Sequence, residues 1–171
     1  MRNSIFRAPI DLKKHVSLIY AEGVFGLDAR KKFPMRGKTA DGILRYAEYK
    51  IAGVIDSTAS TPLSLVSRGA GGEVVAGDIL PPYLYDCKNF NTPIFKNLKE
   101  AKGTIKADVL IIGSAPEGGD LPSEYKSDIV WAIKNNMHIV SGTHYAISED
   151  SEFLSLAKKH KTILWDARRL C

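Results

Sequence analysis

The segment between Gly23 and Lys38 combines glycines with positively charged side chains just before a predicted helix. Its cations are Arg30, Lys31, Lys32, Arg36 and Lys38, and Asp28 is the single acid between Leu27 and Lys38. Cations at a helix start are unfavourable unless an anion joins them, because the first backbone N–H groups already form a positive end. We therefore expect a phosphate or carboxylate here, bound by Arg36, Lys38 and Thr39. A solvated basic loop is the alternative.

A P-loop is the first motif to test against this segment. Gly37, Lys38 and Thr39 fit the end of the pattern G-x-x-x-x-G-K-[ST]. Lys32, however, stands where the first glycine belongs, and Pro34 removes a backbone N–H from the loop that would surround phosphate. The segment is therefore a poor match to a P-loop.

A dinucleotide-binding fingerprint is the second motif. Gly23 and Gly26 follow the first predicted strand, and Asp56 and Ser57 end the second, where an acid would meet a ribose. The distance from these glycines to the helix is longer than the fingerprint allows. We expect Gly23, Gly26, Asp56 and Ser57 to contact a nucleotide. The alternative is two turn glycines and a carboxylate that bonds to its own loop.

Two further loops follow predicted strands and carry small or polar residues. The first provides Gly113, Ser114, Gly118 and Gly119, whose glycines allow the backbone to approach a ligand closely, and the second begins with Ser141 and Gly142. Open α/β sheets bind ligands at the carboxyl ends of their strands, so we expect both loops to line the cofactor site. His144 lies in the second loop among small polar residues and is the candidate catalytic group, as an acid–base or hydrogen-bonding residue.

The elements that must position these residues alternate along the chain. Apolar runs typical of buried strands cover residues 15–23, 51–57, 92–95, 109–112, 137–142 and 162–166. Helical patterns cover 39–50, 96–103, 121–136 and 149–161, with Thr39 as an N-cap and Pro122 in a first turn. This order predicts an α/β fold, a doubly wound and mostly parallel sheet of about five to six strands flanked by helices.

Composition narrows the class of protein. The chain has 171 residues, the size of one domain, and we treat 1–171 as a single domain. Its 24 Lys and Arg exceed its 19 Asp and Glu by five, a small excess that does not favour nucleic acid. Cys87 and Cys171 form no zinc-binding spacing, and the N-terminus has no apolar run. We expect a cytoplasmic protein with no metal and no membrane partner.

A set of longer motifs resembles a known family. "AEGVFG", "KTADGILRYAEYKIAGVIDST", "ADVLIIGSAPEGGDLP" and "AIKNNMHIVSGTHYAISED" together resemble the N-terminal Rossmann-like domain of a two-domain family long labelled as having unknown function. Members carry a P-loop NTPase-like second half, and some are D-glutamate N-acetyltransferases. The resemblance implies a Rossmann-like fold, a nucleotide-like ligand and a missing C-terminal P-loop domain. The abrupt end after "DARRLC" agrees with that expectation.

A looser similarity concerns the run from "PIFKNLKEA" through "ADVLIIGSAP" to "NNMHIVSGTH". It is similar to the CoA-binding domain of succinyl-CoA synthetases, and it makes CoA, acetyl-CoA or an adenine nucleotide the expected cofactor. Three hypotheses remain open. The chain is a module that binds this small anionic ligand within an N-acetyltransferase, a complete enzyme with His144 as base, or a structural, homo-oligomeric domain with no ligand of its own.

Overall fold

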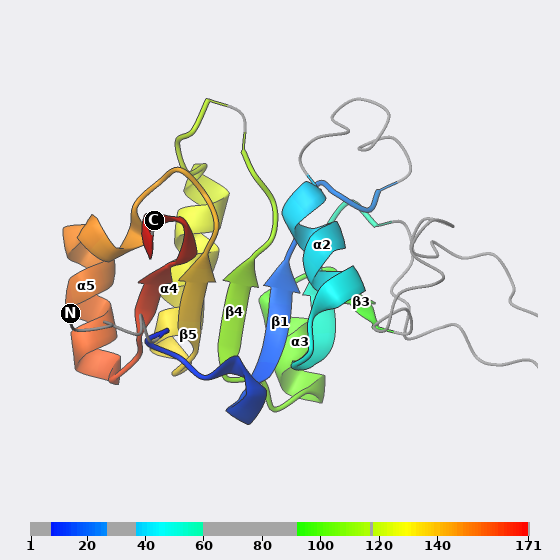
Figure 1. The fold of residues 1–171 in the computed structure, drawn as a ribbon, viewed down its shortest axis with the longest axis horizontal. Helices are drawn as coiled ribbons and strands as arrows, with labels where there is room; N and C mark the ends of the chain where they lie inside the picture. The colour runs from blue at the N-terminus through cyan, green and yellow to red at the C-terminus, as the bar shows by residue number, and fades with distance from the viewer. Residues whose placement is uncertain (1–7, 27–36, 60–91, 117, 171) are drawn as a thin grey trace, which may run out of the picture.

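The computed structural model describes residues 8–26, 37–59, 92–116 and 118–170 (Figure 1). Most of the basic segment, with Arg36, and the loop-rich segment 60–91 lie outside the described residues, so the prediction for Arg36 is not addressed by the structure.

Six parallel strands form one sheet (Figure 1). In spatial order they are β3 (Ile94–Phe95), β2 (Lys50–Ile55), β1 (Val16–Tyr20), β4 (Val109–Ile112), β5 (His138–Ser141) and β6 (Leu164–Asp166). The order 3-2-1-4-5-6 is that of the Rossmann fold. The predicted α/β class and parallel sheet are therefore confirmed.

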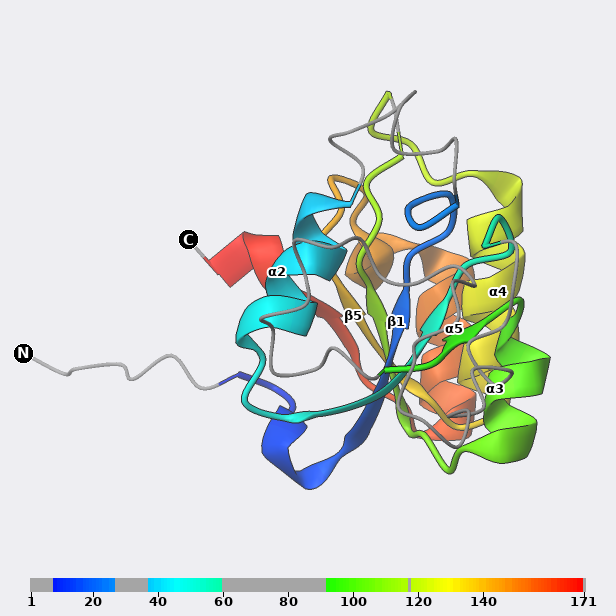
Figure 2. The ribbon, with the colours of Figure 1, turned by 90° about the vertical axis from the view of Figure 1, so that its right-hand side faces the viewer.

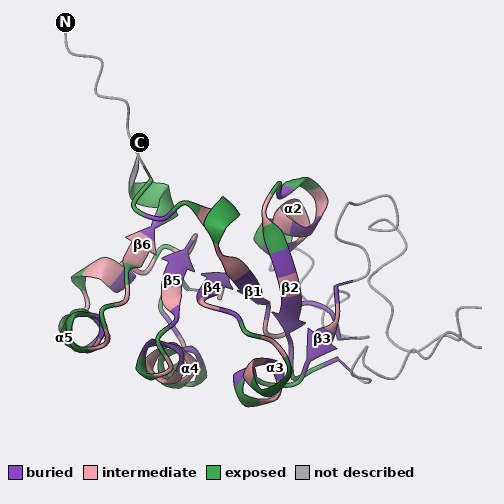
Figure 3. Ribbon diagram, turned by 90° about the horizontal axis from the view of Figure 1, so that it is seen from below, coloured by how far each residue is buried: buried purple, intermediate pink, exposed green. Residues whose placement is uncertain are grey.

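Helices cover both faces of this sheet (Figures 2 and 3). Helix α2 (Lys38–Tyr46) packs on one face. The other face carries α3 (Leu98–Thr104), α4 (Ser123–Lys134) and α5 (Ser151–His160). Short 3-10 helices, η1 (Leu12–Lys14), η4 (Ile147–Glu149) and η5 (Ala167–Leu170), complete the described elements.

The central strands explain why the sheet is buried on both sides. Along β1, Ile19 packs in the core under α2, whereas Leu18 and Tyr20 pack in the core under α3, α4 and α5. All four residues of β4 are buried as well. Successive side chains of a strand point to opposite faces, so an uninterrupted apolar run is what a doubly covered strand requires.

Two helix starts differ from the sequence-based expectation. Thr39 is not an N-cap, because α2 begins one residue earlier at Lys38 with Gly37 as its cap residue. Pro122 is the cap residue of α4 rather than part of its first turn. The start of α2 is set by a tertiary contact, since the amide of Ala40 donates to the carbonyl of Gly113 at 2.9 Å. The preference of threonine for N-cap positions, on which the prediction for Thr39 rested, could not reveal that contact.

Candidate functional site

The strand order reverses direction between the neighbouring strands β1 and β4. These strands are neighbours, yet the chain leaves β1 for α2 on one face and leaves β4 for α4 on the other. The helices that follow the two strands therefore lie on opposite faces of the sheet. In open α/β sheets this divergence is where ligands bind.

The start of α2 lies directly against the end of β4. A Cβ atom placed on Gly113 would lie 2.7 Å from Cγ2 of Ile19 and 3.2 Å from Cα of Ala40. Such distances leave no room for a side chain, so Gly113 is the residue that lets α2 approach the sheet. The methyl group of Thr39 would lie 3.7 Å from a Cβ atom on Gly142, which brings the end of β5 to the same place.

This helix start is open to a ligand. Lys38 and Thr39 are exposed, and within the described ranges their backbone N–H groups donate to no acceptor. Gly37, the cap residue, offers no side chain to satisfy them. Two free amides, the helix dipole and the ammonium group of Lys38 all favour an anion.

The loops after β4 and β5 converge beside it. Gly118 and Gly119 have φ angles of +83° and +82°, which residues with side chains adopt with strain. A Cβ atom on Gly119 would lie 3.9 Å from Cβ of His144. The exposed His144 ring places Nε2 3.3 Å from Nη1 of Arg168 in η5. Arg168 is thus a second cation at this edge that sequence reasoning did not single out.

Two predicted serines are buried and bond within the protein. The hydroxyl of Ser114 lies 2.8 Å from that of Tyr125, and the hydroxyl of Ser141 lies 2.8 Å from that of Thr143. Both pairs brace the loops after β4 and β5. A ligand contact by either hydroxyl stays a prediction.

Asp56 organises the loop after β1. It is fully buried, and its carboxylate accepts five hydrogen bonds, which come from the amides of Gly23, Val24, Phe25 and Thr58 and from the hydroxyl of Thr58. Gly26, the other predicted glycine, lies in contact range of Thr58. Asp56 therefore fits the alternative of a carboxylate that bonds to its own loops, and a ribose contact stays a prediction.

A second acid repeats this arrangement on the other half of the sheet. Asp166, at the end of β6, accepts hydrogen bonds from the amides of Ile147 and Ser148 and from the hydroxyl of Ser148. It fixes the loop after β5 as Asp56 fixes the loop after β1. An acid at the end of a short apolar strand was the available sequence signal for Asp166.

A cavity of about 530 Å³ opens at the carboxyl ends of β1 and β2, on the side of α3 and α4. Of the predicted residues, Gly23 and Ser57 line it. Tyr20 and Asp128 also line it and are joined by a hydrogen bond of 2.6 Å. Sequence reasoning missed this pair, although Asp128 lies one helical spacing, three residues, after buried Tyr125.

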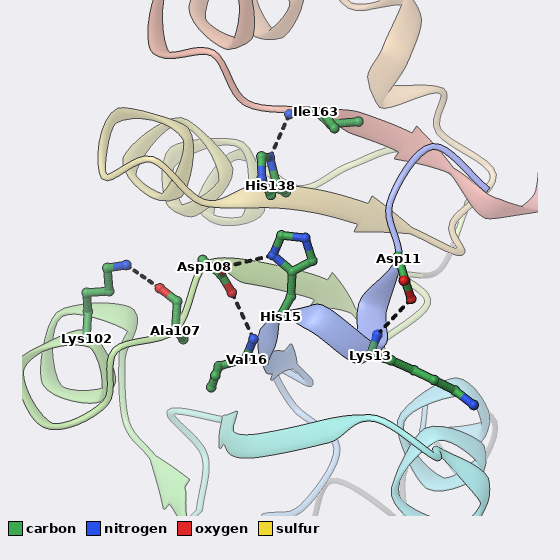
Figure 4. A network of polar contacts seen from close by, with 9 residues as sticks. All are labelled: Asp11, Lys13, His15, Val16, Lys102, Ala107, Asp108, His138 and Ile163. Carbon is green, nitrogen blue, oxygen red and sulfur yellow. Dashed lines mark hydrogen bonds and ion pairs between the residues drawn. The ribbon is translucent and has the colours of Figure 1, made fainter. Parts of the chain in front are cut away.

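Another polar network lies at the opposite, amino edge of the sheet (Figure 4). Nδ1 of His15 lies 2.8 Å from Asp108, and the amide of Val16 donates to the same carboxylate. The rings of His15 and His138 meet edge to face at 5.4 Å, and Nδ1 of His138 accepts a hydrogen bond from Ile163. This network links β1 and β5 to the residues just before β4 and β6.

The network predicts a pH dependence of stability. Burial, with the nearby His15, lowers the pKa of His138 below its ordinary value of 6.5. The unfolded chain then binds more protons than the folded chain between the folded pKa and about 6.5, so stability falls as pH decreases through that window. We expect a lower free energy of unfolding in urea at pH 5.5 than at pH 7.5.

The variant His138→Asn isolates this contribution. Its side-chain oxygen keeps an acceptor for Ile163 but does not titrate. We expect a smaller loss of stability between pH 7.5 and 5.5 than in the unchanged protein. Burial alone would raise the pKa of Asp108, but the hydrogen bonds from His15 and Val16 outweigh it and lower this pKa below its ordinary value of 3.8. The stability that Asp108 contributes is therefore fully present above about pH 3.8 and does not change between pH 7.5 and 5.5. Equal pH dependence in both proteins would remove His138 as the cause.

The expectations about metals, membranes and oligomers are addressed only in part by the described residues. No group of three His, Cys, Asp or Glu side chains there is arranged to hold a metal ion, and Cys87 and Cys171 lie outside them. None of the helices in the described ranges has the length and apolar character needed to cross a membrane. The sequence suggested that the helix carrying Tyr125 and Trp131 could present an apolar face for dimerisation. Tyr125 is buried in the core and Trp131 packs against that core, so these two residues offer no argument for an oligomer. Homo-oligomer formation and cytoplasmic location stay predictions.

Comparison with known proteins decides the family. Residues 82–170 match the family described as "Domain of unknown function (DUF1611_N) Rossmann-like domain". The chain belongs to this family. Its fold is similar to the crystal structure of a DUF1611 family protein from Anabaena variabilis, with a TM-score of 0.63 and 26% sequence identity over 91% of this chain. The family resemblance inferred from the motifs is confirmed.

A curated relative of this DUF1611 domain carries a functional name. Over 62 residues, 36% of this chain, the sequence is 40% identical to a D-glutamate N-acetyltransferase from Pseudoalteromonas. That match covers 19% of the relative, and the structural match covers 37% of the Anabaena chain. The domain thus spans a minor part of the relatives that it matches.

Proposed function

We propose that this domain binds a nucleotide- or CoA-type anionic ligand at the carboxyl edge of its sheet. The proposal extends to its place in an enzyme: it is the N-terminal part of a D-amino-acid N-acetyltransferase, with D-glutamate as the acceptor. The observation that carries the ligand claim is the start of α2 at the β1/β4 switch point, with two free amides and the exposed Lys38.

The chemistry of acetyl transfer supports a CoA-type ligand over a bare phosphate. Acetyl-CoA presents several phosphate groups and a long neutral arm that ends in the thioester. The start of α2 supplies the amides of Lys38 and Thr39 for a phosphate, and Lys38 supplies a charge. Arg168, on η5 beyond β6, places a second positive charge on the same edge. The named relative from Pseudoalteromonas supports the acyl-transfer class.

His144 has a defined orientation within this proposal. A guanidinium group only donates, so Nε2 accepts in the contact with Arg168 and the ring proton resides on Nδ1. In this arrangement His144 donates a hydrogen bond to the ligand. A general-base role requires Arg168 to release Nε2, and it belongs to the alternative in which the chain is a complete enzyme.

A pair of lysine variants tests the ligand site. We expect Lys38→Ala to weaken acetyl-CoA binding by about fivefold to tenfold in calorimetric titration, because one phosphate contact is lost. The salt dependence of the affinity should also become shallower. Lys106→Ala is the matched control, since Lys106 is an exposed lysine at the amino edge before β4. Equal losses in the two variants would show a general charge effect and contradict the site.

A further inference from the structure

The 530 Å³ cavity beneath α3 and α4 is separate from the start of α2, because the two lie on opposite faces of the sheet. Its walls come from the ends of β1 and β2 with the residues after them, the loop after β4, the two residues before α3 and the first two turns of α4. Such a volume accommodates a small molecule. The proposed function leaves this cavity unassigned.

The charges of the lining exclude the anion proposed for the other face. Among the described residues that line the cavity, Glu22, Glu124 and Asp128 carry carboxylates and Lys96 carries the one ammonium group. A phosphate placed here would face three like charges. An ammonium group would be attracted by them, and Lys96 remains for a carboxylate on the same molecule.

Two of the carboxylates are held in fixed orientations. Glu22 accepts hydrogen bonds from the amide of Ser57, at 2.9 Å, and from its hydroxyl. Asp128 accepts the hydroxyl of Tyr20, which is 2% exposed. Burial, and then the hydrogen bond to Asp128, raise the pKa of Tyr20 far above its ordinary value, so this hydroxyl remains a proton donor.

The wall behind these groups is held together by ring packing and hydrogen bonds. Tyr20 and Tyr125 pack edge to face with ring centroids 4.8 Å apart. The hydroxyl of Tyr125 bonds to Ser114 in the loop after β4 and donates to the carbonyl of Glu22 in the loop after β1. Both loops of the β1/β4 switch point are thereby tied to α4. The polar lining is built into the fold and does not depend on free surface side chains alone.

We propose that this cavity is a subsite for a zwitterionic amino acid. Glu22 and Asp128 receive its ammonium group, Glu124 adds negative charge at the rim, and Lys96 receives a carboxylate. This assignment of a role rests on the proposed acetyl transfer. In that reaction the cavity holds the acceptor amino acid, and the long arm of the acyl donor crosses the carboxyl edge from the other face. The ammonium group must first lose a proton to a base before its nitrogen can attack the thioester and release the CoA thiol. The two sites share the loops after β1 and β4.

Titration of the 171-residue chain with D-glutamate and with glutarate tests the amine preference. Glutarate has the same carbon skeleton and both carboxylates but no amine. We expect D-glutamate to shift backbone amide signals of Glu22, Asp128 and their neighbours in NMR spectra, with an affinity at least about tenfold above that of glutarate. Equal binding of the two, or shifts confined to other regions, would overturn the proposal.

A matched pair of glutamates tests the cavity itself. Glu124 and Glu152 are both exposed acids in the first turn of a helix, but Glu152 lies on α5 away from the lining. We expect Glu124→Gln to weaken D-glutamate binding about threefold and Asp128→Asn about tenfold, with Glu152→Gln unchanged. Asparagine keeps an acceptor for Tyr20, so the fold should survive. Unchanged affinity in Asp128→Asn would refute the assignment.

The same samples separate this inference from the proposed function. Lys38→Ala should affect acetyl-CoA and leave D-glutamate binding unchanged, while Asp128→Asn should do the reverse. Binding of acetyl-CoA without D-glutamate overturns the amino-acid subsite alone. Binding of D-glutamate without acetyl-CoA overturns the nucleotide or CoA site alone.

Discussion

Replacing Gly113 by alanine will destabilise the domain by about 2–3 kcal/mol, the cost of forcing an extra methyl group into a packed site. The new Cβ would meet Ile19 at 2.7 Å and Ala40 at 3.2 Å, and the second contact is with backbone. Relief requires α2 to move away from the sheet, which breaks the hydrogen bond from Ala40 to Gly113. Urea unfolding monitored by circular dichroism measures the loss.

Gly42→Ala is the control for this prediction. Gly42 lies in the same helix, and nothing lies within 4 Å of a Cβ atom placed on it. Alanine there should stabilise the protein by about 0.5–1 kcal/mol, because glycine loses more conformational entropy in a helix. A Gly113→Ala protein as stable as the unchanged chain would mean that α2 does not pack on β4 as described.

Replacing Asp56 by alanine will cost about 4 kcal/mol, the second large effect. The substitution removes a buried acceptor of the amides of Gly23, Val24, Phe25 and Thr58, and the amide of Val24 keeps its hydrogen bond to the carbonyl of Ala21. Each buried group left unsatisfied costs roughly 1–3 kcal/mol, partly recovered as the loop relaxes. We expect a lower unfolding midpoint and faster amide exchange in residues 22–26.

Two other acids calibrate that result. Asp120→Ala, an exposed position, should change stability by less than about 0.5 kcal/mol. The stability loss in Asp166→Ala should lie between those of Asp120→Ala and Asp56→Ala, because Asp166 accepts three hydrogen bonds whereas Asp56 accepts five. If Asp56→Ala keeps full stability but loses ligand affinity, Asp56 acts on the ligand as the dinucleotide fingerprint implied, and its structural role is contradicted.

Much of the fold could be predicted because its signals are local. The run Val109–Ile112 reads as a buried strand from its own residues, and the structure places β4 at those bounds. The short strand β3, Ile94–Phe95, lies within the slightly longer strand that was predicted from the sequence for residues 92–95. Helix starts were less predictable, since the first turn of α2 is anchored by Gly113, far along the chain.

The candidate site was predictable only in its location at the carboxyl edge. Parallel strands all end at that edge, so polar residues after them gather there whatever their partners. Their roles depend on tertiary contacts that no spacing reveals. Tyr20 meets Asp128 across 108 positions, and Asp166 reaches back to Ile147. The same limit applies to Asp56, whose position at a strand end suits either a ligand or a neighbouring loop.

Titration of the isotopically labelled chain with acetyl-CoA, followed by amide chemical shifts, tests the central claim most directly. The claim is that an anionic nucleotide- or CoA-type ligand binds at the carboxyl edge beside the start of α2. It predicts the largest shifts at the amides of Lys38, Thr39, Gly113 and Gly142, all reduced in Lys38→Ala. Saturating ligand with no shifts there, or with shifts centred on the amino edge near His15 and Asp108, would contradict it.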